Sequence, residues 1–189
     1  MKTVIIVNED VTLVQFKNQT QQTKTLLALF QKNKSRLQLF FPGYYSLPLS
    51  FQNIQKLLTQ KEKKFNQDEE YSFAICSKKA KKIIGAIEVD CVCKDAFFSY
   101  WIDKNFENKK IISHSFDKLR EILFQNHFTC LLVHCNIKNK KSITFLTHKG
   151  FTIFSHHQDN NRKKFIFMQQ TKIQYQSLKK LLQSQNERI

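Results

Sequence analysis

Residues 135–151, CNIKNKKSITFLTHKGF, form the stretch of sequence that restricts the fold most. The apolar run Cys130–His134 before it predicts a strand, and Ser142–Lys149 predicts a short helix that ends at Gly150. The residues between them bring two amide side chains and the hydroxyl of Ser142 to the start of this helix. That hydroxyl either caps the helix or takes part in catalysis, and the residues alone favour neither.

The segment before this stretch has the order strand, loop, helix. Phe97–Ile102 predicts a strand, and the spacing of apolar residues in Ile111–Asn126 predicts a helix. The loop between them, Asp103–Lys110, ends at a helix N-terminus, where free backbone N–H groups and the helix dipole favour a phosphate. Three lysines of the loop would add positive charge to such a site: Lys104, Lys109 and Lys110.

The other segments complete one mixed α/β domain over residues 1–189, with a polar C-terminal tail from about residue 173 to 189. Further strands are predicted at Val4–Val7, Val11–Phe16, Tyr71–Cys76, Ile83–Val89, Thr152–Ser155 and Phe165–Gln169. Helices are predicted at Thr23–Phe40 and from Ser50, a predicted N-cap, and a charged loop is predicted at Lys61–Glu70.

The chain is strongly basic, with 31 Lys and Arg against 15 Asp and Glu and a formal net charge of +16. Such a surplus favours polyanionic partners, namely nucleic acid, ribosomes, anionic lipid or a phosphorylated cofactor. A solubilising surface combined with codon bias explains it equally well. The apolar runs are too short for a membrane span or a secretory signal, so we expect a soluble cytoplasmic protein.

Cysteine and histidine give no metal signature. The five cysteines include no Cys-x-x-Cys pair, and the six histidines include no His-Glu-x-x-His motif. His156-His157, near Asp159, is interpreted as the end of a hairpin. We therefore expect neither a metal site nor a disulfide framework.

From Tyr71 to Gln169 the sequence resembles the GNAT superfamily of N-acetyltransferases, and within it the RimJ/RimL branch that acetylates protein N-termini. Several segments carry the resemblance: Tyr71–Ile75 with Ile84-Gly85, Tyr100-Trp101-Ile102, the aromatic Leu39–Tyr45, and Asn139-x-x-Ser142 followed by Leu146 and Lys149-Gly150-Phe151. The resemblance implies a twisted, mostly antiparallel sheet with splayed middle strands and flanking helices, and acetyl-CoA bound in the opening.

The resemblance also implies the residues that bind this cosubstrate. The pantetheine arm would pair with the backbone of Tyr100, Trp101 and Ile102, and Asn139 would hold it. The pyrophosphate would lie on the amides of Asn108, Lys109, Lys110, Ile111 and Ile112. Cys135 stands four residues before Asn139, where RimL proteins also have a cysteine.

The implied mechanism is direct transfer without a metal. A deprotonated amine attacks the thioester carbonyl, and Ser142 donates a proton to the departing thiolate. Glu88, on the strand next to Tyr71–Cys76, is the candidate base, against the alternative of a solvated surface glutamate. The candidate catalytic residues are thus Ser142, Cys135 and Glu88.

The sequence departs from the family pattern in the phosphate loop, where Asn108 and Lys110 replace two glycines. Two function classes stay open: an N-acetyltransferase acting on a protein or peptide amine, for example that of a ribosomal protein, and a catalytically degenerate module that binds ribosomes or nucleic acid through its basic surface. Retention of Asn139 and Ser142 favours the first. No membrane partner is expected, and both a monomer and a homodimer remain compatible with the sequence.

Overall fold

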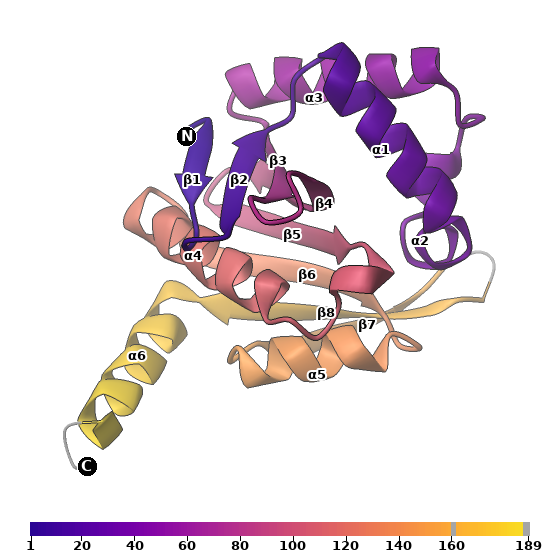
Figure 1. Ribbon diagram of the computed structural model, residues 1–189. Helices are drawn as coiled ribbons and strands as arrows, with labels where there is room; N and C mark the ends of the chain where they lie inside the picture. Colours follow the sequence, from indigo (N-terminus) through magenta and orange to yellow (C-terminus); the bar gives the residue numbers. More distant parts are fainter. Residues whose placement is uncertain (160–161, 187–189) are drawn as a thin grey trace. The chain divides into compact units, whose positions relative to one another are not determined.

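The computed structural model describes residues 1–159 and 162–186. Within these residues, eight strands form one mostly antiparallel sheet in the order β1-β2-β3-β4-β5-β6-β8-β7, with helices flanking it (Figure 1). The predicted mixed α/β class is therefore confirmed. By its contacts the chain divides into two compact units, Met1–Cys91 with Ser99–Glu121, and Val92–Phe98 with Ile122–Ile189.

The first unit holds the N-terminal strands and helices, the end of β5 and the beginning of α4. In chain order its elements are β1 (Val4–Ile6), β2 (Val11–Gln15), α1 (Thr20–Lys32), α2 (Lys34–Phe40), the 3-10 helix η1 (Pro42–Tyr45), α3 (Phe51–Asn66), β3 (Glu70–Ser77), β4 (Lys82–Val92), β5 (Asp95–Ile102), the 3-10 helix η2 (Lys104–Phe106) and α4 (Ile111–Gln125). The strands that the sequence predicts in this unit are confirmed, and β3 and β4 pair as an antiparallel hairpin.

The core of the first unit lies between its strands and the helices α1 and α3, which contact each other (Figure 1). Helix α1 buries Leu26 and Phe30, four residues apart, and α3 buries Ile54 and Leu58 at the same spacing. This spacing places the apolar side chains on one helix face. Trp101, at the end of β5, is buried in the same cluster.

One predicted helix, Thr23–Phe40, is in fact two helices. Helix α1 ends at Lys32 and α2 begins at Lys34, because Asn33 leaves helical geometry with a ψ of 15°. The side-chain amide of Asn33 donates hydrogen bonds to the carbonyl of Leu29 and to a carboxylate oxygen of Asp103. A buried asparagine that bonds to local and distant oxygens competes with the regular helix, which explains the break.

The charged loop predicted at Lys61–Glu70 is wrong for most of its length. Helix α3 begins as predicted, with the Ser50 hydroxyl accepting a hydrogen bond from the Asn53 amide at 3.2 Å, but it continues to Asn66. Lys61 lies on the buried face of α3, and Glu70 is already in β3. The sequence suggested a loop because charged side chains are normally solvated, whereas here opposite charges pair in the interior.

The second unit consists of the start of β5, the end of α4 and the C-terminal elements. These are β6 (Cys130–Asn136), α5 (Lys140–His148), β7 (Thr152–Gln158), β8 (Lys164–Thr171) and α6 (Lys172–Asn186). Strands β7 and β8 form the predicted hairpin, and β8 also pairs antiparallel with β6. The parallel ladder between β5 and β6 is short and joins Asp95–Phe97 to Cys130–Leu132.

Gly150 ends α5 as predicted, with a φ of +85° that favours glycine. A Cβ at this position would also lie 2.7 Å from the side-chain nitrogen of Gln170. The segment predicted as a polar tail forms α6 up to Asn186, and Tyr175 of this helix stacks on Phe124 with 5.2 Å between the ring centroids. The last residues, 187–189, lie outside the described part.

In residues 1–159 and 162–186, no helix combines the length and apolar character needed to cross a bilayer. The same residues contain no group of three or more His, Cys, Asp and Glu side chains arranged to hold a metal ion. The five cysteines are free thiols.

Candidate active site

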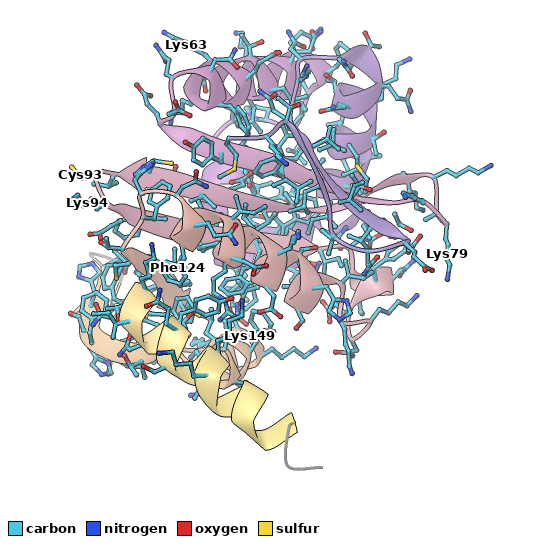
Figure 2. The ribbon with its side chains drawn as sticks, turned by 90° about the vertical axis from the view of Figure 1, so that its left-hand side faces the viewer. Lys63, Lys79, Cys93, Lys94, Phe124 and Lys149 are labelled. Carbon is cyan, nitrogen blue, oxygen red and sulfur yellow. The ribbon has the colours of Figure 1, made fainter. Side chains whose placement is uncertain are left out.

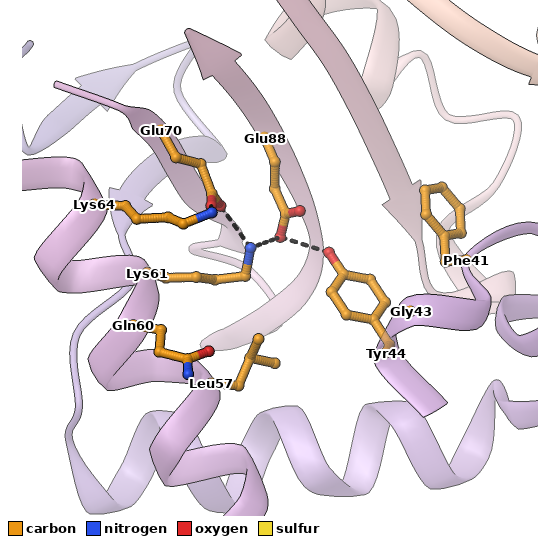
Figure 3. A pocket seen from close by; sticks show the side chains of 9 residues that line it. All are labelled: Phe41, Gly43, Tyr44, Leu57, Gln60, Lys61, Lys64, Glu70 and Glu88. Atoms are coloured by element: carbon orange, nitrogen blue, oxygen red, sulfur yellow. Dashed lines mark hydrogen bonds and ion pairs between the residues drawn. The ribbon is translucent and has the colours of Figure 1, made fainter. Parts of the chain in front are cut away.

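A pocket of about 330 Å³ opens in the first unit between η1, α3 and the strands β3 and β4 (Figure 3). Its lining combines apolar and aromatic side chains with charged ones. The lining residues are Phe41, Gly43, Tyr44, Leu57, Gln60, Lys61, Lys64, Glu70 and Glu88. The pocket thus brings the candidate base Glu88 together with side chains from α3 and η1.

Two carboxylates and one ammonium group lie at the inner end of this pocket. The Lys61 Nζ is 2.6 Å from an oxygen of Glu70 and 3.0 Å from an oxygen of Glu88 (Figure 3). Burial alone would lower the pKa of Lys61, but the two carboxylates outweigh it and hold the pKa above its ordinary value. For Glu70, burial would raise the pKa, but Lys61 and the Ser72 hydroxyl hold it below its ordinary value. Lys61 and Glu70 are therefore both charged at neutral pH.

Tyr44 completes the surroundings of Glu88. Its hydroxyl donates a hydrogen bond of 2.5 Å to the Glu88 carboxylate, from the side of the pocket opposite Lys61 (Figure 3). Burial, with the Glu88 charge adding to it, raises the pKa of Tyr44 well above its ordinary value, so the phenol stays protonated and remains a donor. The side chain of Glu88 is 13 % exposed, so this carboxylate is not the solvated surface glutamate considered as an alternative.

The predicted phosphate loop keeps a backbone geometry that glycine normally takes. Asn108 and Lys110, which replace the two glycines of the family pattern, have φ values of 61° and 57°. Asparagine tolerates this left-handed conformation, whereas for lysine it is strained. The carbonyl of Lys110 accepts a hydrogen bond from the His114 amide in the first turn of α4. Among the other residues of this segment, Lys109 is exposed, Ile111 is buried and Ile112 is half-buried.

Side chains from α1 and α2 anchor the base of this loop. The Lys32 ammonium lies 2.7 Å from a carboxylate oxygen of the buried Asp103. Arg36 forms an ion pair with Glu107 and donates a hydrogen bond to the backbone carbonyl of Ile102. The strand end and the loop that follows it are therefore both fixed to α1 and α2.

The strand end itself packs closely on β4. Trp101 and Ile102 are buried, and Tyr100 is half-buried with its ring edge-on to Phe116. A Cβ at Gly85 of β4 would lie only 2.4 Å from the carbonyl oxygen of Trp101. Only glycine allows this approach of the two backbones.

In the second unit, the structure brings Cys135, Asn139 and Ser142 together. Asn139 is the N-cap of α5: its side-chain oxygen accepts a hydrogen bond from the Ser142 amide at 3.2 Å. Ser142 is therefore not the cap, and its half-buried hydroxyl lies in the first turn. Burial raises the pKa of the Cys135 thiol, and a hydrogen bond with Ser142 opposes this only in part, so the thiol is protonated at neutral pH.

The sequence matches the family described as acetyltransferase (GNAT) domain over residues 11–152. The chain belongs to the GNAT acetyltransferase family. This match confirms the resemblance found in the sequence. No curated protein sequence matches the chain significantly.

Solved structures with the GNAT fold are similar over most of the chain. The RimL ribosomal L7/L12 α-N-protein acetyltransferase, in complex with coenzyme A bound through a disulfide, has a TM-score of 0.79 at 17% identity, with 89% of this chain and 97% of that chain covered. The ribosomal-protein-S5-alanine acetyltransferase from Vibrio fischeri has a TM-score of 0.79 at 15% identity, with coverages of 90% and 97%. The microcin C7 self-immunity acetyltransferase MccE, in complex with acetyl-CoA and AMP, has a TM-score of 0.77 at 20% identity, with coverages of 90% and 97%.

Three residues of this GNAT domain were not predicted from the sequence. Lys61 and Tyr44 contact Glu88, and Arg36 holds the predicted phosphate loop. For Lys61 the signal was present, because it lies three residues after Leu58 and four before Phe65 on the apolar face of α3. For Tyr44 and Arg36 no comparable signal exists, since their partners lie 44 and 71 residues away along the chain.

Proposed function

We propose that this protein is an acetyl-CoA-dependent N-acetyltransferase whose acceptor is a primary amine, and specifically the N-terminal α-amine of a protein. The observation that carries the proposal is Glu88, a carboxylate inside a 330 Å³ pocket and fixed between Tyr44 and Lys61. Family membership supports the acetyl transfer. Two neighbours named as ribosomal-protein acetyltransferases support a protein acceptor, with a ribosomal protein as the first candidate.

The donor half of the proposed site consists of the segments that the resemblance assigns to acetyl-CoA. The left-handed backbone at Asn108 and Lys110 supports this assignment, because it preserves a glycine-type loop before the N-terminus of α4. In this proposal the amides of residues 108–112 bind the pyrophosphate, the backbone of residues 100–102 pairs with the pantetheine, and Asn139 holds it.

In the proposed reaction, Glu88 takes a proton from the acceptor ammonium, directly or through a water molecule. The neutral amine then forms a bond with the thioester carbonyl carbon. As the C–S bond breaks, Ser142 donates its hydroxyl proton to the departing thiolate and takes up the second proton of the nitrogen, and Glu88 gives its proton to water. The products are free coenzyme A, the acetylated amine and one proton released to water. Cys135 forms no covalent bond in these reaction steps, in agreement with its protonated thiol.

The net charge of +16 supports a second candidate, a module that binds RNA or ribosomes through its basic surface without catalysis. Exposed lysines occur in both units, including Lys63 and Lys79 in the first and Lys94 in the second (Figure 2). Electrostatic binding of this kind weakens steeply as salt rises. A salt titration of RNA binding separates the two candidates, because a flat response contradicts the second.

Calorimetric titration of acetyl-CoA tests the proposed enzyme first. We expect saturable binding to the wild type and weaker binding to Asn139→Ala, with Asn126→Ala, at the end of α4, as the matched control. A screen of peptides with free N-termini then identifies the acceptor. Absence of binding at millimolar acetyl-CoA would overturn the proposal.

A further inference from the structure

Lys61 makes every hydrogen bond that its ammonium group can donate. Its Nζ lies 2.6 Å from Glu70, 3.0 Å from Glu88 and 3.4 Å from the Ser72 hydroxyl. A lysine ammonium has three N–H donors, so these three acceptors saturate it. The side chain is only 9 % exposed. The position between the two carboxylates is therefore already filled by a cation of the protein itself.

The charged side chains that line the pocket cancel in formal charge. Lys61 and Lys64 contribute two positive charges, and Glu70 and Glu88 contribute two negative charges. Lys64 is held more loosely, 3.5 Å from Glu70 with its side chain 49 % exposed. Without Lys61, the same lining would carry one net negative charge and an empty position between two carboxylates.

A cationic group that keeps its charge in this pocket faces an unfavourable choice, unlike the acceptor amine, which gives its proton to Glu88 in the proposed reaction. If it displaces Lys61 from Glu70 and Glu88, it leaves a buried ammonium without compensation. If it stays beside Lys61, it is repelled by a like charge in surroundings of low dielectric. An uncharged group entering the pocket meets neither penalty.

We propose that Lys61 is a specificity-determining residue, whose ammonium occupies the cation position between Glu70 and Glu88 and so excludes acceptors that carry a second positive charge. The inference rests on the proposed function and narrows its substrate class. The accepted amines belong to chains without positively charged side chains next to the N-terminus, and polyamines and lysine-rich N-termini are rejected.

The test compares two peptides that differ only at the second residue, alanine or lysine, as acceptors for the wild type and for Lys61→Met. Methionine keeps an unbranched side chain but removes the charge. We expect kcat/KM for the lysine peptide, relative to the alanine peptide, to rise at least about tenfold in Lys61→Met. Lys63→Met, an exposed position on the same helix, should leave the ratio unchanged. The double variant Lys61→Met/Glu70→Gln, whose lining is again neutral, should lose most of the gain.

An unchanged ratio in an active Lys61→Met overturns the inference. A calorimetric titration with spermidine needs no turnover, so it tests the inference even if the proposed function is wrong. Lys61→Met should bind spermidine at least about tenfold more tightly than the wild type, even if neither protein acetylates a peptide. Equal affinities overturn the inference. If Lys61→Met does not fold, Glu70→Gln gives the opposite test. The pocket lining of Glu70→Gln carries one net positive charge, so kcat/KM for the lysine peptide relative to the alanine peptide should fall. An unchanged ratio again overturns the inference.

Discussion

The side-chain oxygen of Asn139 accepts a hydrogen bond of 3.2 Å from the backbone amide of Ser142. Both residues of the Asn-x-x-Ser motif are thus tied to the first turn of α5, one through its side chain and the other through its backbone. The bond leaves the Ser142 hydroxyl available for its contact with Cys135. The two residues therefore have separable roles, which substitution can distinguish.

Substitution within this motif should separate binding from turnover. Asn139→Ala removes the N-cap, so we expect a loss of about 1 kcal/mol in the free energy of unfolding together with weaker acetyl-CoA binding. Ser142→Ala retains the backbone bond, so turnover should fall while acetyl-CoA affinity stays nearly constant. Calorimetry and steady-state kinetics measure the two effects, with Thr147→Ala on the same helix as control. Unchanged turnover in Ser142→Ala would remove this residue from the mechanism.

Replacing Lys110 by glycine should stabilise the protein. The φ of 57° at Lys110 lies in the left-handed region, which costs a residue with a Cβ about 1–2 kcal/mol. We expect Lys110→Gly to raise the free energy of unfolding by about 1 kcal/mol and the melting temperature by about 2–4 °C. Asn108→Gly should raise both quantities by less, because asparagine tolerates the left-handed conformation. Thermal unfolding measures both, and Lys109→Gly, outside the left-handed region, should be destabilising. A lower melting temperature for Lys110→Gly would show that its side chain stabilises the loop by more than the strain.

Glu88→Gln should reduce kcat by about 10²–10⁴, the range typical for loss of a general base. Acetyl-CoA affinity should not change, since Glu88 is assigned to the acceptor half of the site. The loss should shrink as the pH rises above about 8, where an N-terminal amine is already neutral. A pH–rate profile measures this, and Glu69→Gln, an exposed neighbouring glutamate, is the control. A loss that stays constant with pH would argue against the role of Glu88 as base.

The buried pair of Lys61 and Glu70 should make stability sensitive to acid. The pKa of Glu70 lies below its ordinary value of 4.5 in the folded protein, so the unfolded chain binds this proton more readily. Stability from this group is present above pH 4.5 and is lost as the pH falls through the lowered pKa. Chemical denaturation between about pH 6 and pH 3 should give a smaller acid loss in Glu70→Gln than in the wild type, and Glu9→Gln is the exposed control. Equal slopes would contradict the contribution of Glu70.

Local patterns in the sequence were sufficient for most elements of the fold. β-Branched residues predicted β2, and the helical spacing of Phe116, Leu119 and Leu123 predicted α4. The predictions of secondary structure were wrong where a polar side chain has a partner that is distant along the chain. Asn33 breaks a helix through its contact with Asp103, and Lys61 lies on the apolar face of α3. A helix or strand is specified by residues a few positions apart, whereas these contacts join positions that only the folded chain brings close.

Some features of the candidate site likewise followed from the sequence, and others only from the tertiary structure. The sequence by itself determined the Asn139-x-x-Ser142 motif, the position of Glu88 on a strand and the place of the loop before α4, because each depends on the order of residues along the chain. Only the tertiary structure decided that Lys61 lies between Glu70 and Glu88. The antiparallel pairing of β3 with β4 brings the two carboxylates to the same part of the sheet, and α3 packs on β3. Burial of Lys61 is favourable only when both negative charges are already there.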